Sequence, residues 1–211
     1  MGVGKWIAVG AGVAALGAVA VVAQYRDTEE PAYAVIESEG AFELREYEPM
    51  IVAEVTHTGD RRRALTAGFR RLAAYIFAQD RPGDKIAMTS PVMQDAPEKI
   101  EMTSPVTVGQ GDGIGSWRTR FVMPARYTMD TLPEPPADIT LTQIPSRRMA
   151  SVQFDGRGTS QDLAKMEGFL RRWMEEEGLV ASGPAEFAFY DAPMVPPIMR
   201  RNEVMIPVEA E

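Results

Sequence analysis

The stretch DRRRALTAGFRRLAAYIFA, at positions 60–78, holds the clearest structural pattern in this 211-residue chain. Its large apolar residues recur at spacings of three and four, namely Leu65, Phe69, Leu72 and Ile76. That spacing places them on one face of a helix, where they can pack against a core. Asp60 is a residue type that caps helix N-termini, and Pro82-Gly83 cannot continue the pattern. The sequence therefore predicts an amphipathic helix that runs from Asp60 to about Ala78.

A second helix of the same design is expected later in the chain. Thr159 or Ser160 can cap it, and its pattern ends near Gly178. Its expected buried face consists of Leu163, Met166, Phe169, Leu170, Trp173 and Met174. Glu167 precedes Arg171 by four residues on the opposite face, which favours an ion pair in water.

Short alternating runs, typical of strands, stand before and after both helices. They cover parts of 33–55, then 85–92, 99–108, 116–123, 139–144, 147–154, 186–190 and 203–208. We interpret 139–144 and 147–154 as a strand pair turned at Pro145-Ser146. The order strand–strand–helix–strands thus occurs twice, on either side of the Pro-rich connection 132–137. It predicts an internally duplicated α+β domain whose antiparallel sheet curls and carries both helices on one side.

Composition and charge exclude several classes of function. Hydrophobic residues make up 45% and charged residues 25%, which is the balance of a globular protein. The net charge of −8 argues against a nucleic-acid partner, because phosphate binding needs an excess of Lys and Arg. The chain has no cysteine, which excludes disulfides, thiolate metal sites and Cys nucleophiles. Its single histidine, His57, excludes a His-rich metal site.

The N-terminus contains an uncharged apolar run from Trp6 to Ala23. Its 18 residues would span about 27 Å as a helix, close to the thickness of a bilayer core. The length favours a membrane anchor, whereas the small residues at its end favour a cleaved signal peptide. We therefore expect segment 1–24 to be an anchor or signal, 25–32 a linker, 33–208 the folded domain and 209–211 a tail. The domain is expected on the periplasmic side, held by one span or released by cleavage.

The first helix also offers a candidate binding surface. Thr66, Phe69, Ala73 and Phe77 extend its apolar face on one flank, and Arg63 and Arg70 border that flank. Small and aromatic side chains beside arginines suit a flat apolar ligand with carboxylates at its rim. The alternative is a wide amphipathic helix with solvated arginines. Met88, Met93, Met102, Met123 and Met194 could line an adaptable pocket or fill gaps in the core.

Five motifs carry a resemblance to a known family. In chain order they are FELREYEP at 42–49, KIAMTSPV at 85–92, FVMP at 121–124, YDAPMVPP at 190–197 and RRNEV at 200–204. Together, around two helices, they resemble the SOUL/haem-binding protein family over residues 33–208. The near repeat KIEMTSPV, which follows at 99–106, is similar to that of bacterial and plant members.

The resemblance implies a distorted antiparallel β-barrel with two flanking helices, built from two similar halves. It also implies non-covalent binding of haem or another tetrapyrrole in an apolar cleft near the first helix and the loop after Tyr190. Such a protein would be a carrier, buffer or sensor. Carried onto this chain, the expected haem-binding residues are Arg63, Thr66, Phe69, Arg70, Ala73, Phe121, Met123, Tyr190, Met194 and Arg200.

Three positions depart from patterns found in the family. Ala74 and Val195 stand where some animal members have basic residues, so the propionates would have to pair with other arginines. Glu46 stands where some members offer a histidine to iron. Either Tyr47, His57 or a methionine is the axial ligand, or binding is weak or purely hydrophobic. The alternative for His57 is a solvated or hydrogen-bonded histidine at a strand end. A ligand without iron is a further possibility.

Two alternatives from other classes remain open. The family fold is similar to that of bacterial effector-binding domains, some of which hydrolyse small molecules. Glu46 or Glu203, with Tyr47 or Tyr190, would then be the acid/base candidates. No local motif of a hydrolase or nucleotide-binding enzyme occurs in the chain. The third possibility is an interaction domain whose cleft is filled by its own side chains.

Overall fold

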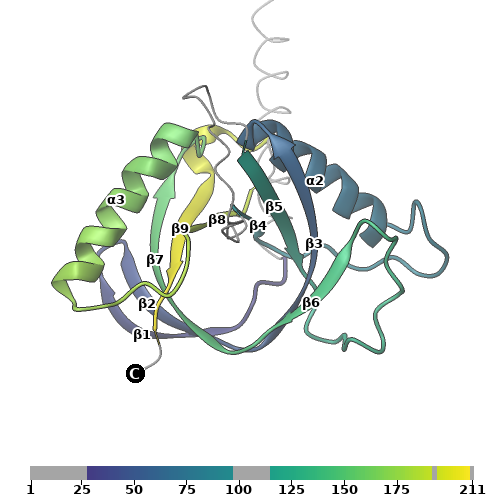
Figure 1. Ribbon diagram of the computed structural model, residues 1–211, viewed down its shortest axis with the longest axis horizontal. Coiled ribbons are helices and arrows are strands. Elements are labelled where there is room, and N and C mark those ends of the chain that lie inside the picture. Colours follow the sequence, from purple (N-terminus) through teal and green to yellow (C-terminus); the bar gives the residue numbers. More distant parts are fainter. Residues whose placement is uncertain (1–27, 97–114, 192–193, 210–211) are drawn as a thin grey trace, which may run out of the picture.

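The computed structural model describes residues 28–96, 115–191 and 194–209, and it shows one curved antiparallel sheet with two helices (Figure 1). The elements of the first half are β1 (Tyr33–Glu39), β2 (Phe42–Tyr47), β3 (Met50–Gly59), α2 (Arg61–Ile76), β4 (Val92–Asp95) and β5 (Gly115–Val122). Those of the second half are β6 (Thr140–Ile144), β7 (Arg147–Asp155), α3 (Ser160–Glu176), β8 (Glu186–Phe189), the 3-10 turn η1 (Pro197–Met199) and β9 (Arg201–Pro207). Both α-helices pack on the outer side of the curve, α2 over β3 and β5, and α3 over β7 and β9.

The strand order is β1-β2-β7-β9-β8-β4-β5-β3-β6. Without β1, this order is symmetric about its centre, so that each strand has an equivalent from the other half of the chain: β2 and β6, β7 and β3, β9 and β5, and β8 and β4. This symmetry confirms the duplicated α+β plan. The two end strands, β1 and β6, are not paired with each other among the described residues. Closure of the sheet into the expected barrel is therefore not confirmed, and the observed form is an open, strongly curved sheet.

Each half gives one strand to the other half. β2 pairs with β7, with Phe42 opposite Val152, and β6 pairs with β3, with Met50 opposite Ile144. The predicted pairing of 139–144 with 147–154 is therefore wrong. The reason lies in the cores: Ile139 of the β6 segment packs under α2, whereas Val152 of β7 packs under α3.

The helices agree with the sequence pattern. The Asp60 side chain accepts a hydrogen bond from the Arg63 backbone N–H, and Thr159 forms a reciprocal capping box with Asp162. The predicted Glu167–Arg171 ion pair is present at 2.7 Å. Phe169 departs from the expected buried face, because its side chain is 36% exposed.

One predicted strand is wrong, and another is not tested by the described residues. Residues 85–91 form a connection rather than a strand, since Ile86 is buried beneath α2 and its N–H bonds to the Ile76 carbonyl. The strand begins at Val92, after Pro91, which lacks the N–H that a ladder needs. The other strand, 99–108, lies outside the described residues, and so does the apolar run from Trp6 to Ala23. No helix of the described ranges is long and apolar enough to cross a membrane.

Candidate functional site

A pocket of about 370 Å³ lies beside α2, and we call it the α2 pocket. Its volume falls within the range of about 300–1,000 Å³ that is usual for small-molecule sites. The pocket is lined by Thr28, Leu65, Thr66, Phe69, Arg70, Met88, Thr89, Ser90, Val92, Phe189, Tyr190 and Asp191. It thus joins one face of α2, the segment before β4 and the chain that follows β8.

The wall formed by α2 is held in place by close packing against the sheet. The ring of Phe69 meets the buried ring of Phe121 of β5 edge-on, with centroids 5.4 Å apart. Gly68 permits this approach, because a side chain there would overlap Thr119 on β5. Leu65 and Phe69 are four residues apart and therefore face the same way into the pocket.

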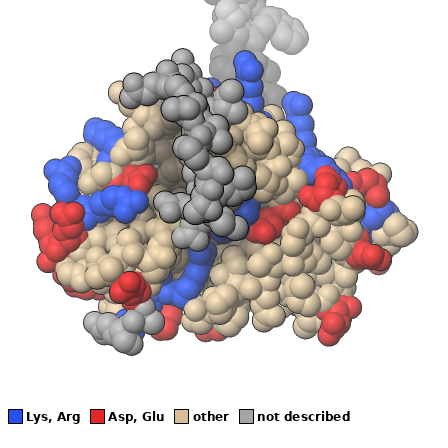
Figure 2. All heavy atoms as spheres, in the orientation of Figure 1, with Lys and Arg blue, Asp and Glu red and all other residues tan. Residues whose placement is uncertain are grey.

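A cationic groove adjoins the α2 pocket on the outer side of the helix. It is lined by Asp60, Arg62, Arg63, Thr66, Ala67 and Arg70, so that Thr66 and Arg70 belong to both surfaces. Within the described part of the chain, the guanidinium groups of Arg62, Arg63 and Arg70 make no hydrogen bond or ion pair. By contrast, Arg71 is paired with Asp138 and Asp80. Figure 2 shows basic side chains projecting at the top of the molecule, where α2 begins in Figure 1.

The structure brings four of the predicted residues together in the α2 pocket: Thr66, Phe69, Arg70 and Tyr190. Arg63 lies in the adjoining groove, and Phe121 lies beneath Phe69. The remaining four are placed elsewhere. Ala73 packs in the core under α2, Met123 lines a different pocket, Met194 is largely exposed, and Arg200 donates to the Val195 carbonyl.

Met88, which the sequence offered as a pocket methionine, does line the α2 pocket. Sequence reasoning missed Thr89 and Ser90 of the same KIAMTSPV motif and Asp191 of YDAPMVPP, which also line it. Both motifs were recognised as family features, but neither has an apolar periodicity from which its contact with the pocket could be predicted. Phe189 faces the pocket at the end of β8, which the strand pattern alone could not have indicated.

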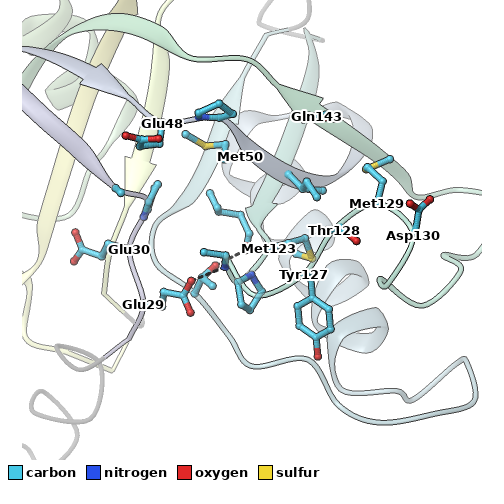
Figure 3. A pocket seen from close by; sticks show the side chains of 18 residues that line it. Glu29, Glu30, Glu48, Met50, Met123, Tyr127, Thr128, Met129, Asp130 and Gln143 are labelled. Atoms are coloured by element: carbon cyan, nitrogen blue, oxygen red, sulfur yellow. Dashed lines mark hydrogen bonds between the residues drawn. The ribbon is translucent and has the colours of Figure 1, made fainter.

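A second pocket, of about 480 Å³, lies between the chain before β1, the start of β3 and the segment after β5 (Figure 3). Its lining includes the carboxylates of Glu29, Glu30, Glu48 and Asp130. None of its described lining residues is Lys or Arg. Such a surface repels a ligand with carboxylates, so that the α2 pocket is the better candidate for the predicted ligand class.

Three of the acid/base candidates, Glu203, Tyr47 and Tyr190, lie on the concave side of the sheet in a buried network of ion pairs and hydrogen bonds. Glu203 is completely buried and accepts hydrogen bonds from Arg45 at 2.8 Å, Tyr190 at 2.8 Å and Arg201 at 3.0 Å. Burial acts to raise the pKa of Glu203, but the hydrogen bond and charge of Arg45 outweigh it and lower the pKa. Burial and the Glu203 charge raise the pKa of Tyr190 well above its usual value.

These groups are held rather than free to react. The void beside Tyr47 and Tyr190 measures about 10 Å³, which is room for about one water molecule. A carboxylate with three donors and no space for a substrate is typical of a structural ion pair. Glu46, the fourth candidate, lies on β2 between β1 and β7, and its side chain is exposed, away from this network.

His57 lies on β3, opposite Trp117 of β5, and is not among the residues that line the α2 pocket. Its buried Nδ1 has no hydrogen-bond partner within the described residues. Within the same ranges, no three His, Asp or Glu side chains converge as a metal site would require. The sulfur that lines the α2 pocket is that of Met88.

Comparisons with known proteins agree with this architecture. Residues 28–207 match the family model described as SOUL heme-binding protein. The fold is similar to the C-terminal domain of EcmrR, at 14% identity over 85% of this chain and 99% of that chain, with a TM-score of 0.60. It is also similar to a hydrolase from Listeria innocua, at 12% identity over 82% and 94% of the two chains, with a TM-score of 0.53. No curated protein matches the chain in sequence.

Proposed function

The chain belongs to the SOUL haem-binding protein family, and we propose from this premise that it binds haem or another tetrapyrrole non-covalently in the α2 pocket. One observation carries the proposal: an open apolar pocket adjoins arginines that have no acidic partner among the described residues. A macrocycle needs an apolar slot for its ring and guanidinium partners for its carboxylates. Leu65, Phe69 and Phe189 supply the first requirement, and Arg70 and Arg63 supply the second.

Among the described residues, the α2 pocket offers few side chains that could be axial ligands of a haem iron. The Tyr190 hydroxyl is already committed to Glu203, and its raised pKa opposes the tyrosinate that would bind iron. Met88 is the remaining soft donor among the described lining residues. We therefore propose that ring burial and carboxylate pairing provide most of the affinity, and that a metal-free porphyrin also binds.

We propose further that the run from Trp6 to Ala23 holds the domain at a membrane, on the periplasmic side. Its length and lack of charge support a membrane span. A protein of this kind would carry, buffer or sense tetrapyrroles close to a lipid surface.

Titration of haem and of protoporphyrin into the full chain in detergent tests the binding proposal. We expect a saturable Soret shift with micromolar affinity for both ligands, because no strong axial ligand contributes. Phe69→Asp and Arg70→Glu should each weaken binding by about tenfold or more, which is about 1.4 kcal/mol. Arg172→Glu, an exposed charge reversal on α3, and His57→Ala should leave the affinity unchanged.

The absence of a saturable shift up to tens of micromolar would overturn the proposal. A loss confined to His57→Ala would instead move the ligand away from the α2 pocket and onto the single imidazole.

A further inference from the structure

Large apolar side chains stand in solvent on the segment that follows the α2 pocket. The exposed fractions of Met194, Ile198 and Met199 are 69%, 82% and 45%. These residues lie within a few positions of Tyr190 and Asp191, which line the pocket. Three large exposed apolar side chains so close together in the chain favour contact with another apolar phase.

The same segment lies beside the start of both helices. The carbonyl of Arg200, just after η1, accepts a hydrogen bond from the Gly156 N–H at 3.1 Å. Arg61, the first residue of α2, donates to the Gly158 carbonyl at 3.0 Å and to Ser160 of α3 at 3.2 Å. These bonds bring η1, the β7–α3 turn and the N-terminus of α2 to one edge of the molecule, at the top of Figure 1.

This edge is basic although the whole chain carries a charge of −8. Helix α2 contains five arginines and no acidic residue between Arg61 and Ile76. Two of these arginines are not free to bind a partner, because Arg61 is buried and Arg71 is paired with Asp138. The acidic neighbours Asp60 and Asp162 are occupied as helix caps. Arg62, Arg63 and Arg70 therefore remain available for phosphate groups.

The described part of the chain begins at the α2 pocket, which Thr28, its first residue, helps to line. The apolar run ends at Ala23, and five extended peptide units reach at most about 18 Å. A membrane that holds this run is consequently within reach of the pocket mouth.

We propose that the docking edge, defined as Arg62, Arg63, Arg70, Met194, Ile198 and Met199, rests on an anionic bilayer. Its apolar side chains enter the interface and its arginines pair with lipid phosphates. The α2 pocket then opens toward the membrane, so that an apolar ligand passes between bilayer and pocket without crossing water. This inference rests on the membrane tether of the proposed function, but not on the identity of the ligand.

Site-specific fluorescence on the full chain in nanodiscs tests the docking edge. Because the chain has no cysteine, Ile198→Cys and Val180→Cys each give one labelling site. Val180 is 55% exposed and follows the far end of α3, so it serves as the matched control. We expect spin-labelled lipids in discs rich in phosphatidylglycerol to quench a fluorophore at 198 at least about twofold more than one at 180.

Charge reversal separates docking from mere attachment. The double variant Arg62→Glu/Arg63→Glu should abolish the quenching at 198. The control Lys165→Glu/Arg172→Glu, on α3, should preserve it. Thermal melts check that both double variants fold. Equal quenching at 198 and 180 in a chain that stays with the discs would reject docking and leave the tether intact. A chain that separates from the discs would reject both. Neither result depends on whether haem binds.

Discussion

At the scale of single residues, Glu203 illustrates how the concave side of the sheet is stabilised. Its buried carboxylate accepts hydrogen bonds from Arg45, Tyr190 and Arg201, and Arg201 also lies 3.6 Å from the Tyr190 ring centroid. A buried pair of this kind stabilises the fold little relative to an apolar replacement, but removing one partner leaves a buried charge without compensation.

Glu203→Gln should therefore lower the free energy of unfolding by about 3–5 kcal/mol. Glu43→Gln is the matched control, because Glu43 also contacts Arg45, at 2.6 Å, but its side chain is 30% exposed. Because solvent reaches the Glu43 carboxylate, its loss should cost less, about 0–1 kcal/mol. Urea denaturation of the three proteins measures both values, and equal losses would show that Glu203 has no special role.

The same residue predicts a dependence of stability on pH. The folded-state pKa of Glu203 lies below its ordinary value of 4.5. A carboxylate with a lowered pKa stabilises the folded state above pH 4.5, and this stabilisation is lost as the pH falls toward the folded pKa. Melting temperatures measured below pH 4.5 should thus fall more steeply for the wild type than for Glu203→Gln. Parallel curves would contradict this assignment.

From residue patterning alone, the candidate site was predictable only where it lies on a helix, and Tyr190 was assigned by the family resemblance. The period of α2 placed Thr66, Phe69 and Arg70 on one flank, and all three line the α2 pocket. Met123, which the resemblance assigned to the ligand, lines a different pocket, because a resemblance in motif does not fix which cavity a strand end faces.

At the scale of elements, the packing of α2 on β5 depends on a residue that the core pattern ignores. Gly68 is buried, and a side chain at this position would collide with Thr119. Gly168 lies in the middle of α3, with nothing within contact distance of a side chain built there. The two helices are equivalent in the duplicated plan, so their glycines form a matched pair.

Gly68→Ala should destabilise the protein by about 1–3 kcal/mol, since the helix must shift from the sheet. Gly168→Ala should be neutral or should stabilise by up to about 1 kcal/mol, because alanine favours the helix. Thermal melts of both variants measure the difference. A stable Gly68→Ala protein would mean that α2 is free to move, and with it the wall of the α2 pocket.

Helices were easier to predict than strand partners, and the reason is local information. The caps and apolar period of α2 and α3 lie within each segment. The partner of β6 is set by the core that Ile139 joins, which residues near β6 in the chain do not determine. Proximity in sequence suggested β7, but the exchange of strands places β6 beside β3.

At the scale of the whole molecule, the exchanged strands make the two halves depend on each other. β2 completes the sheet under α3, and β6 completes the sheet under α2. Each half alone would therefore lose a strand and expose the edge of another, β3 in the first half and β7 in the second. An edge of that kind, next to an incomplete core, is unfavourable for a stable fold.

Cleavage between the halves tests this dependence. A protease site inserted after Glu134, an exposed position between the halves, allows the folded protein to be cut. The cut protein should keep the circular dichroism and cooperative melt of the uncut insertion variant, because the exchanged strands hold the pieces together. Fragments separated in denaturant should each refold without a cooperative transition and regain one when mixed. If either fragment alone melts cooperatively, the halves are independent folding units, and the strand exchange only joins them.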